Sequence, residues 1–140
     1  MVAVLGICFT YREAKQTRKT QKATFFKDLY STMYSDPDIR KAYYQIEYGE
    51  FTYSDSFHGS KMEPLIDRLL SFADLVCYLY DQKMLTENEM VFFKYEFIRI
   101  YVDTNVKNYL KFLEDFYQKN KTGTKPFPSY VSYCSQYAVL

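Results

Sequence analysis

One stretch of the sequence gathers the side chains best suited to acid–base or metal chemistry: Tyr53, His58, Glu63 and Asp67. Glu63 and Asp67 are four residues apart, so both carboxylates lie on one face if this stretch is helical. His58 comes just before that helix, and an imidazole beside two carboxylates could bind a divalent metal ion or transfer protons. The spacing matches no established metal motif. The competing interpretation is that Glu63 caps the helix, Asp67 is solvated or paired with a basic residue, and His58 packs under the preceding loop.

A second candidate is Asp74, the only charged residue in the most apolar segment of the chain. A buried carboxylate needs a hydrogen bond or an ion pair, and the expected partners are a tyrosine hydroxyl, Lys94 or Arg99. With Tyr53 and His58, Asp74 is therefore a candidate for contacting a ligand. The alternative interpretation is a structural hydrogen bond inside the core.

Other motifs for catalysis and cofactor binding are absent from the sequence. Its four glycines do not cluster, which excludes a phosphate loop or a dinucleotide fingerprint. Cys8, Cys77 and Cys134 lie too far apart for zinc pairs and are typical of reduced cysteines in a cytosolic protein. No cofactor is predicted.

Charge divides the chain into a basic N-terminal arm and a mildly acidic remainder. Residues 1–27 contain six basic residues and one acidic residue, whereas the rest contains 12 basic and 16 acidic residues. The arm begins with an apolar run about half as long as a membrane-spanning helix. Two interpretations are open: the cytosolic end of a membrane helix, or the first buried turns of a soluble helix. Because the basic stretch that follows is too charged to enter a core, we expect the helix to project and its apolar turns to be covered by lipid, detergent or another protomer. The residues assigned to this membrane or partner contact are Val2, Leu5, Ile7, Phe9, Arg12, Lys15, Arg18 and Lys19.

Helical periodicity and capping signals predict an all-α fold, a bundle of four to five helices with a long N-terminal helix. Only four prolines and four glycines interrupt the chain, which disfavours a sandwich or barrel. The expected helices follow start signals at Ser35 or Asp36, at Ser60, at Thr86 and at Asp103 or Thr104. The predicted organisation is an arm over 1–22, a bundle over 23–120 and a tail over 121–140.

Two details of packing follow from the apolar pattern. The helix through Leu69 and Leu75 is apolar on most sides, so it should be central, with both leucines in the core. The irregular segment 50–60 carries Phe51, Tyr53 and Phe57, and these aromatic residues should pin it to the body.

Several short segments resemble a family of small bacterial proteins of unknown function. The resemblance extends from Val2 to Lys119 and rests on Ser35–Arg40, Tyr48–Phe51, Phe57–Ser60, Asp67–Phe72, Cys77–Tyr80 and Phe93–Glu96. It implies an N-terminal membrane helix, a basic stretch and a helical cytosolic domain. The apolar run of this chain is shorter than that family pattern requires.

The sequence thus predicts a non-enzymatic interaction or regulatory module on the cytoplasmic side, associated with a bacterial inner membrane or with an oligomer. Its partner would be another protein or a second copy, because 28 phenylalanines and tyrosines exceed what a core of this size readily buries. One alternative is a small-molecule or metal site at His58, Glu63 and Asp67. Another is nucleic-acid binding through the basic arm, which is disfavoured because no aromatic residues are interleaved with its basic ones.

Overall fold

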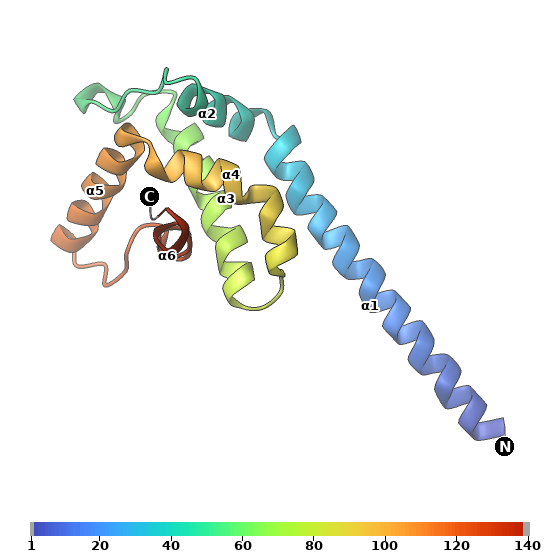
Figure 1. Ribbon diagram of the computed structural model, residues 1–140. Coiled ribbons are helices and arrows are strands. Elements are labelled where there is room, and N and C mark those ends of the chain that lie inside the picture. The colour runs from blue at the N-terminus through green and yellow to red at the C-terminus, as the bar shows by residue number, and fades with distance from the viewer. Residues whose placement is uncertain (1, 139–140) are drawn as a thin grey trace.

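The computed structural model describes residues 2–138, with side chains from residue 12 onward (Figure 1). This part of the chain is all-α, as predicted, and contains six α-helices and no strand. A single 3-10 turn, Asp55–Phe57, lies between the second and third helices. The α-helices are α1 (Val2–Ser35), α2 (Pro37–Glu47), α3 (Glu63–Asp81), α4 (Glu87–Val102), α5 (Thr104–Lys119) and α6 (Pro128–Tyr137).

Three helices begin at side-chain caps that the sequence predicts. Asp36 accepts hydrogen bonds at 3.0 Å from two backbone N–H groups in the first turn of α2, and Pro37 occupies its first position. Thr86 and Glu89 form a reciprocal capping box at the start of α4. Asp103 caps α5 in the same way as Asp36 caps α2. These local bonds satisfy backbone donors that have no partner inside the helix.

The C-terminal segment 121–140, expected to be a separate tail, instead supplies part of the core. It contains α6, which packs against α3 and α4 and buries Tyr130, Tyr133 and Cys134. The Tyr130 hydroxyl donates a 2.8 Å hydrogen bond to the carbonyl oxygen of Phe97. Helix α6 packs in this way because its residues carry no charge and its apolar side chains share one helical face. The predicted bundle of four to five helices did not include α6, which is the sixth helix.

Helix α3 is central, but only one of its two predicted core leucines is buried. Leu69 is fully buried between neighbouring helices, whereas 48% of Leu75 is exposed. The main contacts of α3 are with α2 and α6. The run of apolar residues around Leu75 therefore covers more of the helix surface than its neighbours can bury.

The loop between α2 and α3 is pinned by aromatic side chains, as predicted. Phe51 and Phe57 are both buried, and their rings meet edge to face at 5.5 Å. The half-buried Tyr53 packs on Phe57, with ring centres 5.6 Å apart. This packing holds the residues that follow in a defined position beside α3.

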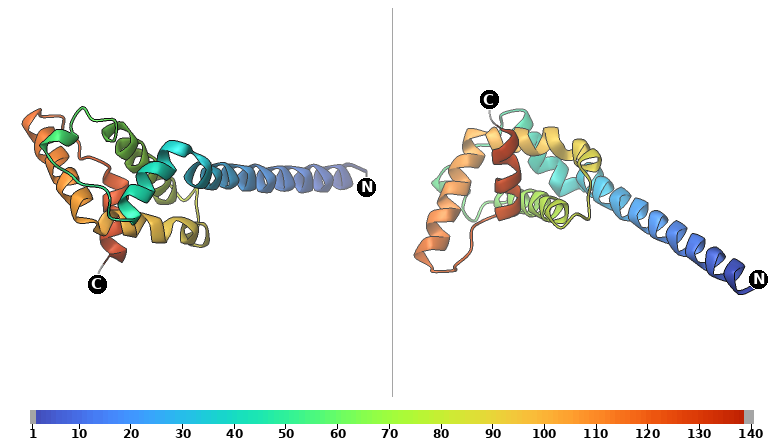
Figure 2. Two further views of the ribbon diagram at one scale, coloured as in Figure 1. Left: turned by 90° about the horizontal axis from the view of Figure 1, so that it is seen from above. Right: turned by 60° about the horizontal axis from the view of Figure 1, so that its bottom comes forward.

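Helix α1 leaves the body as a long arm in all three views (Figures 1 and 2). The side chains of residues 12–24 are exposed, and α1 joins the core only near its end, through Leu29 and Met33. The arm residues Val2, Leu5, Ile7 and Phe9, listed above as a lipid or partner contact, lie outside the side chains that the structure describes. Within residues 2–138, no helix combines the length and apolar character needed to cross a bilayer.

Candidate functional site

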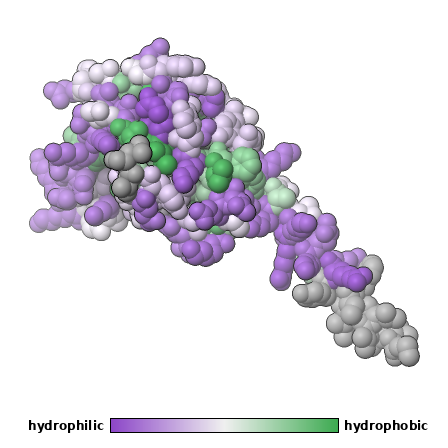
Figure 3. Space-filling view, in the orientation of Figure 1, coloured by the Kyte–Doolittle hydropathy of each residue, from purple (hydrophilic) through white to green (hydrophobic). Residues whose placement is uncertain are grey.

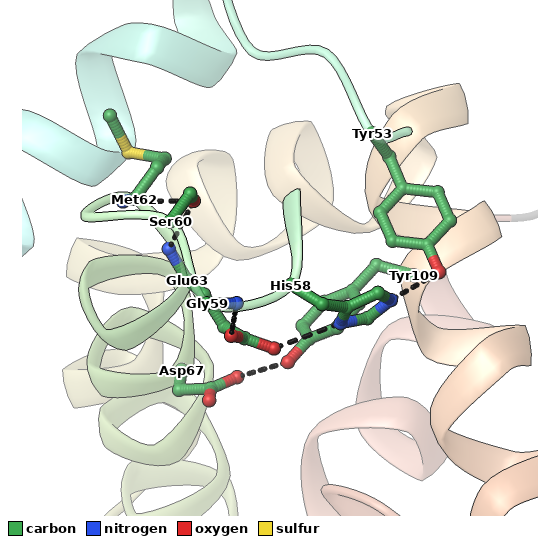
Figure 4. A network of polar contacts seen from close by, with 8 residues as sticks. All are labelled: Tyr53, His58, Gly59, Ser60, Met62, Glu63, Asp67 and Tyr109. Atoms are coloured by element: carbon green, nitrogen blue, oxygen red, sulfur yellow. Dashed lines mark hydrogen bonds and ion pairs between the residues drawn. The ribbon is translucent and has the colours of Figure 1, made fainter. Parts of the chain in front are cut away.

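Three of the residues chosen from the sequence do meet, around the ring of His58 (Figure 4). Nε2 of His58 lies 3.0 Å from the Tyr53 hydroxyl, and Nδ1 lies 3.0 Å from Oε1 of Glu63. The imidazole also packs against Phe112 of α5, with ring centres 4.2 Å apart. His58 is thus oriented by a carboxylate on one side and a phenol on the other.

Glu63 has a second role at the start of α3. Its Oε2 atom accepts a 2.6 Å hydrogen bond from the backbone N–H of Gly59, while Ser60 Oγ accepts from the N–H of Glu63 at 3.3 Å. The result is a displaced capping box, because the carboxylate reaches Gly59 rather than Ser60. The Gly59 bond, together with His58, holds the pKa of Glu63 below its ordinary value.

Asp67 is held by a partner that the sequence did not indicate. Its Oδ1 accepts a 2.6 Å hydrogen bond from the hydroxyl of Tyr109, which is buried on α5. Burial raises the pKa of Asp67, and burial with the nearby carboxylate also raises the pKa of Tyr109. Tyr109 therefore stays protonated and donates, so Asp67 is paired with a phenol rather than with a basic residue.

These carboxylates do not converge as a metal site requires. Across the described residues, no group of three His, Cys, Asp or Glu side chains is arranged to hold a metal ion. Glu63 faces His58 and Gly59, whereas Asp67 faces Tyr109 (Figure 4). The predicted metal site of His58, Glu63 and Asp67 therefore does not form, because each carboxylate accepts a hydrogen bond from another part of the protein.

The network ties three elements together. Tyr53 and His58 belong to the loop, Glu63 and Asp67 to α3, and Tyr109 to α5. The backbone N–H of Tyr53 adds a bond of 3.0 Å to the Asn105 side chain at the start of α5. Burial raises the pKa of Tyr53, which is the opposite of what activation as a base or nucleophile needs. The geometry thus favours a structural role. We call the hydrogen-bonded set Tyr53, His58, Glu63, Asp67 and Tyr109 the latch.

Asp74 takes part in a different contact from Tyr53 and His58. Its Oδ1 accepts a 2.9 Å hydrogen bond from the backbone N–H of Tyr130 in the first turn of α6. Neither expected basic partner contacts it: the Lys94 ammonium lies over the ring of Tyr137, and Arg99 pairs with Glu47 at 3.1 Å. Asp74 therefore caps α6 from a neighbouring helix, and the three ligand candidates do not form one site.

A second feature, whose place the sequence does not indicate, is a cluster of exposed aromatic and aliphatic side chains where α1 meets α4. Figure 3 shows hydrophobic side chains at the surface over this junction. Phe92 of α4 contacts two rings of α1, with ring centres 5.5 and 6.0 Å away. Val91, Phe92 and Tyr95 are each more than half exposed. We call the set Phe26, Tyr30, Val91, Phe92 and Tyr95 the aromatic face.

Polar contacts on either side keep this face in place. The Tyr34 hydroxyl lies 2.7 Å from the carbonyl oxygen of Phe92 and 2.9 Å from the carboxylate of Glu96. Tyr95 donates a 2.9 Å hydrogen bond to Glu47 of α2. The aromatic face is thus a fixed surface spanning α1 and α4.

Comparison with protein-family models, curated proteins and solved structures finds no match for the chain. The features of the molecule that bear on its function are therefore the latch and the aromatic face.

Replacing Glu63 by glutamine should lower the free energy of unfolding by about 1–3 kcal/mol, because the charged acceptor for His58 and Gly59 is lost. Folding lowers the pKa of Glu63, so the stabilisation is fully present when the pH is above the ordinary carboxyl pKa. It disappears as the pH falls through the lowered pKa of Glu63 in the folded protein. Urea unfolding from pH 7 to pH 3 should show the two proteins converge in acid. A difference that stays constant with pH would contradict the latch.

Proposed function

We propose that this protein is a non-enzymatic interaction module that associates with a second copy of itself through the aromatic face. The observation that carries the proposal is the ring contact between the exposed Tyr30 and Phe92, with Val91 and Tyr95 also exposed within one turn of Phe92 on α4. Tyrosine and phenylalanine are enriched in interface centres because they bury a large area with little loss of side-chain freedom. Scattered exposed residues would need no explanation, but contacting ones at a helix junction do.

The charge distribution supports a second copy as the partner. Residues 1–27, which include the arm, contribute a net charge of +5 and the rest of the chain −4. Within the described residues, the arm has one ion pair with its own body, between Lys22 and Glu89 at 3.6 Å. The aromatic face lies at the base of the arm, so pairing two such faces with the arms antiparallel places each basic arm near the acidic body of the other copy. Opposite charges then guide association and oppose wrong registers.

Sedimentation velocity on the full chain should give a reversible dimer. Replacing Val91 by glutamate, at a position 63% exposed, should raise the dimer dissociation constant on the order of tenfold or more by placing a charge in the interface. Leu75→Glu on α3 is the matched control, since Leu75 is 48% exposed and outside the aromatic face. It should leave the dissociation constant unchanged.

Three results would overturn the proposal. The wild-type chain could remain a monomer over a wide range of concentration, or V91E could associate as tightly as the wild type. A chain that stays monomeric but binds vesicles of anionic phospholipid would instead assign the arm to a membrane surface.

High salt should raise the dissociation constant of the dimer, because part of the attraction between the two copies is between exposed charges.

A further inference from the structure

A groove of about 500 Å³ lies between α5, α6 and the loop that joins them. It has an apolar floor, to which Tyr101, Leu110, Val131, Pro126 and Pro128 contribute. Its volume is in the range of sites that enclose small organic molecules. The groove shares no residue with the aromatic face or the latch.

The groove exists because α5 is only partly covered. Val106 and Tyr109 are buried, but the next residues on its apolar side, Leu110 and Leu113, are half-buried. The main contacts of α5 are with α4. Pro126, in the loop between α5 and α6, lines the side of α5 that no helix covers, and an apolar groove remains there instead of a closed core.

The rim of this groove is basic. Lys107 and Lys111 are one turn apart on α5, and Lys125 comes from the loop, with Glu114 as the one acidic side chain among the lining residues. The Lys107 ammonium lies 6.0 Å from the ring of Tyr101 on the floor. The ion pairs formed among residues 12–138 do not use these three lysines. Apolar walls with several ammonium groups at one edge match a molecule with an apolar body and an anionic end.

We propose that the α5–α6 groove binds a small amphipathic anion of the fatty-carboxylate class. The alkyl chain lies along Leu110 and Val131, and the carboxylate meets Lys107 and Lys111. Burial of the chain supplies affinity, and charge-assisted hydrogen bonds to the ammonium groups supply selectivity for an anion. The proposal does not depend on self-association.

Calorimetric titration with decanoate, kept below its micellar concentration, tests the class of ligand. Decanamide and decylammonium have the same chain with a neutral or a cationic end. Decanoate should bind about tenfold more tightly than decanamide, and decylammonium should show no binding, because one charged hydrogen bond is worth about that ratio. Equal affinity for decanoate and decanamide would overturn the proposal.

Variants locate the site. Lys107→Gln with Lys111→Gln should weaken decanoate binding about tenfold and leave decanamide unchanged. Lys41→Gln with Lys61→Gln is the control, because both residues are exposed and neither lines the groove. Ser132→Trp, at an exposed position on the groove wall, should fill the channel and abolish binding without altering thermal unfolding. Undiminished binding to S132W, or equal loss in the control pair, would place the ligand elsewhere and refute the site.

Discussion

A chain that ends at Phe127 is expected to lose cooperative unfolding, because α6 is part of the core. Removing it uncovers α3 and takes away the buried side chains of Tyr130, Tyr133 and Cys134. Each large buried residue is worth about 3 kcal/mol or more, and the net stability of a domain is only about 5–15 kcal/mol. Circular dichroism during heating should show a broad, weak transition. An unchanged midpoint would mean that α6 is dispensable.

Point variants separate packing from hydrogen bonding at the same helix. Tyr130→Ala should cost about 3–5 kcal/mol, whereas Tyr130→Phe, which removes only the bond to the Phe97 carbonyl, should cost about 1–3 kcal/mol. Tyr78→Ala is the matched control, since that tyrosine is 50% exposed on α3. Its cost should stay below about 1 kcal/mol. A similar loss for Tyr78 and Tyr130 would contradict the burial of α6.

The two leucines of α3 provide the second large expected effect. Leu69→Ala should lower the free energy of unfolding by about 2–5 kcal/mol, because it opens a cavity in a fully buried position. Leu75→Ala should cost less than about 1 kcal/mol, since much of that side chain is exposed. Urea denaturation of both variants provides the comparison. Equal losses would place Leu75 in the core and contradict the orientation of α3.

Features controlled by neighbouring residues could be predicted from the sequence. Caps at Asp36, Thr86 and Asp103 use hydrogen bonds that span only two or three residues, so the residue types alone are informative. The pinned loop also follows from local composition, because Phe51 and Phe57 are apolar residues in a polar segment. The all-α class is the sum of such signals.

Features that depend on distant partners could not be predicted in this way. Helix α6 follows a segment of helix breakers, and its burial depends on the shape of α3 and α4. Likewise, Leu69 and Leu75 belong to one apolar run, and only the packed neighbours distinguish their faces. An apolar run on all sides of a helix has no periodicity that identifies the buried face.

The candidate site shows the same division. Of the four residues that the sequence groups, Tyr53, His58 and Glu63 do meet, because they are close in the chain and flank a helix start, whereas Asp67 bonds elsewhere. Tyr109, whose hydroxyl donates a hydrogen bond to Asp67, is 42 positions from Asp67 in the sequence, and no local pattern indicates this contact. The aromatic face joins α1 and α4, so it too appears only when the helices are placed.

Isotope-filtered NOE spectroscopy on a mixture of labelled and unlabelled protein tests most directly whether two copies meet through the aromatic face. Intermolecular contacts are expected between the Val91 methyl groups of one copy and the rings of Phe92, Tyr95 or Tyr30 of the other. V91E should remove these contacts and leave the fold intact. A dimer whose intermolecular contacts lie elsewhere, or a mixture without any, would show that the aromatic face is not the interface.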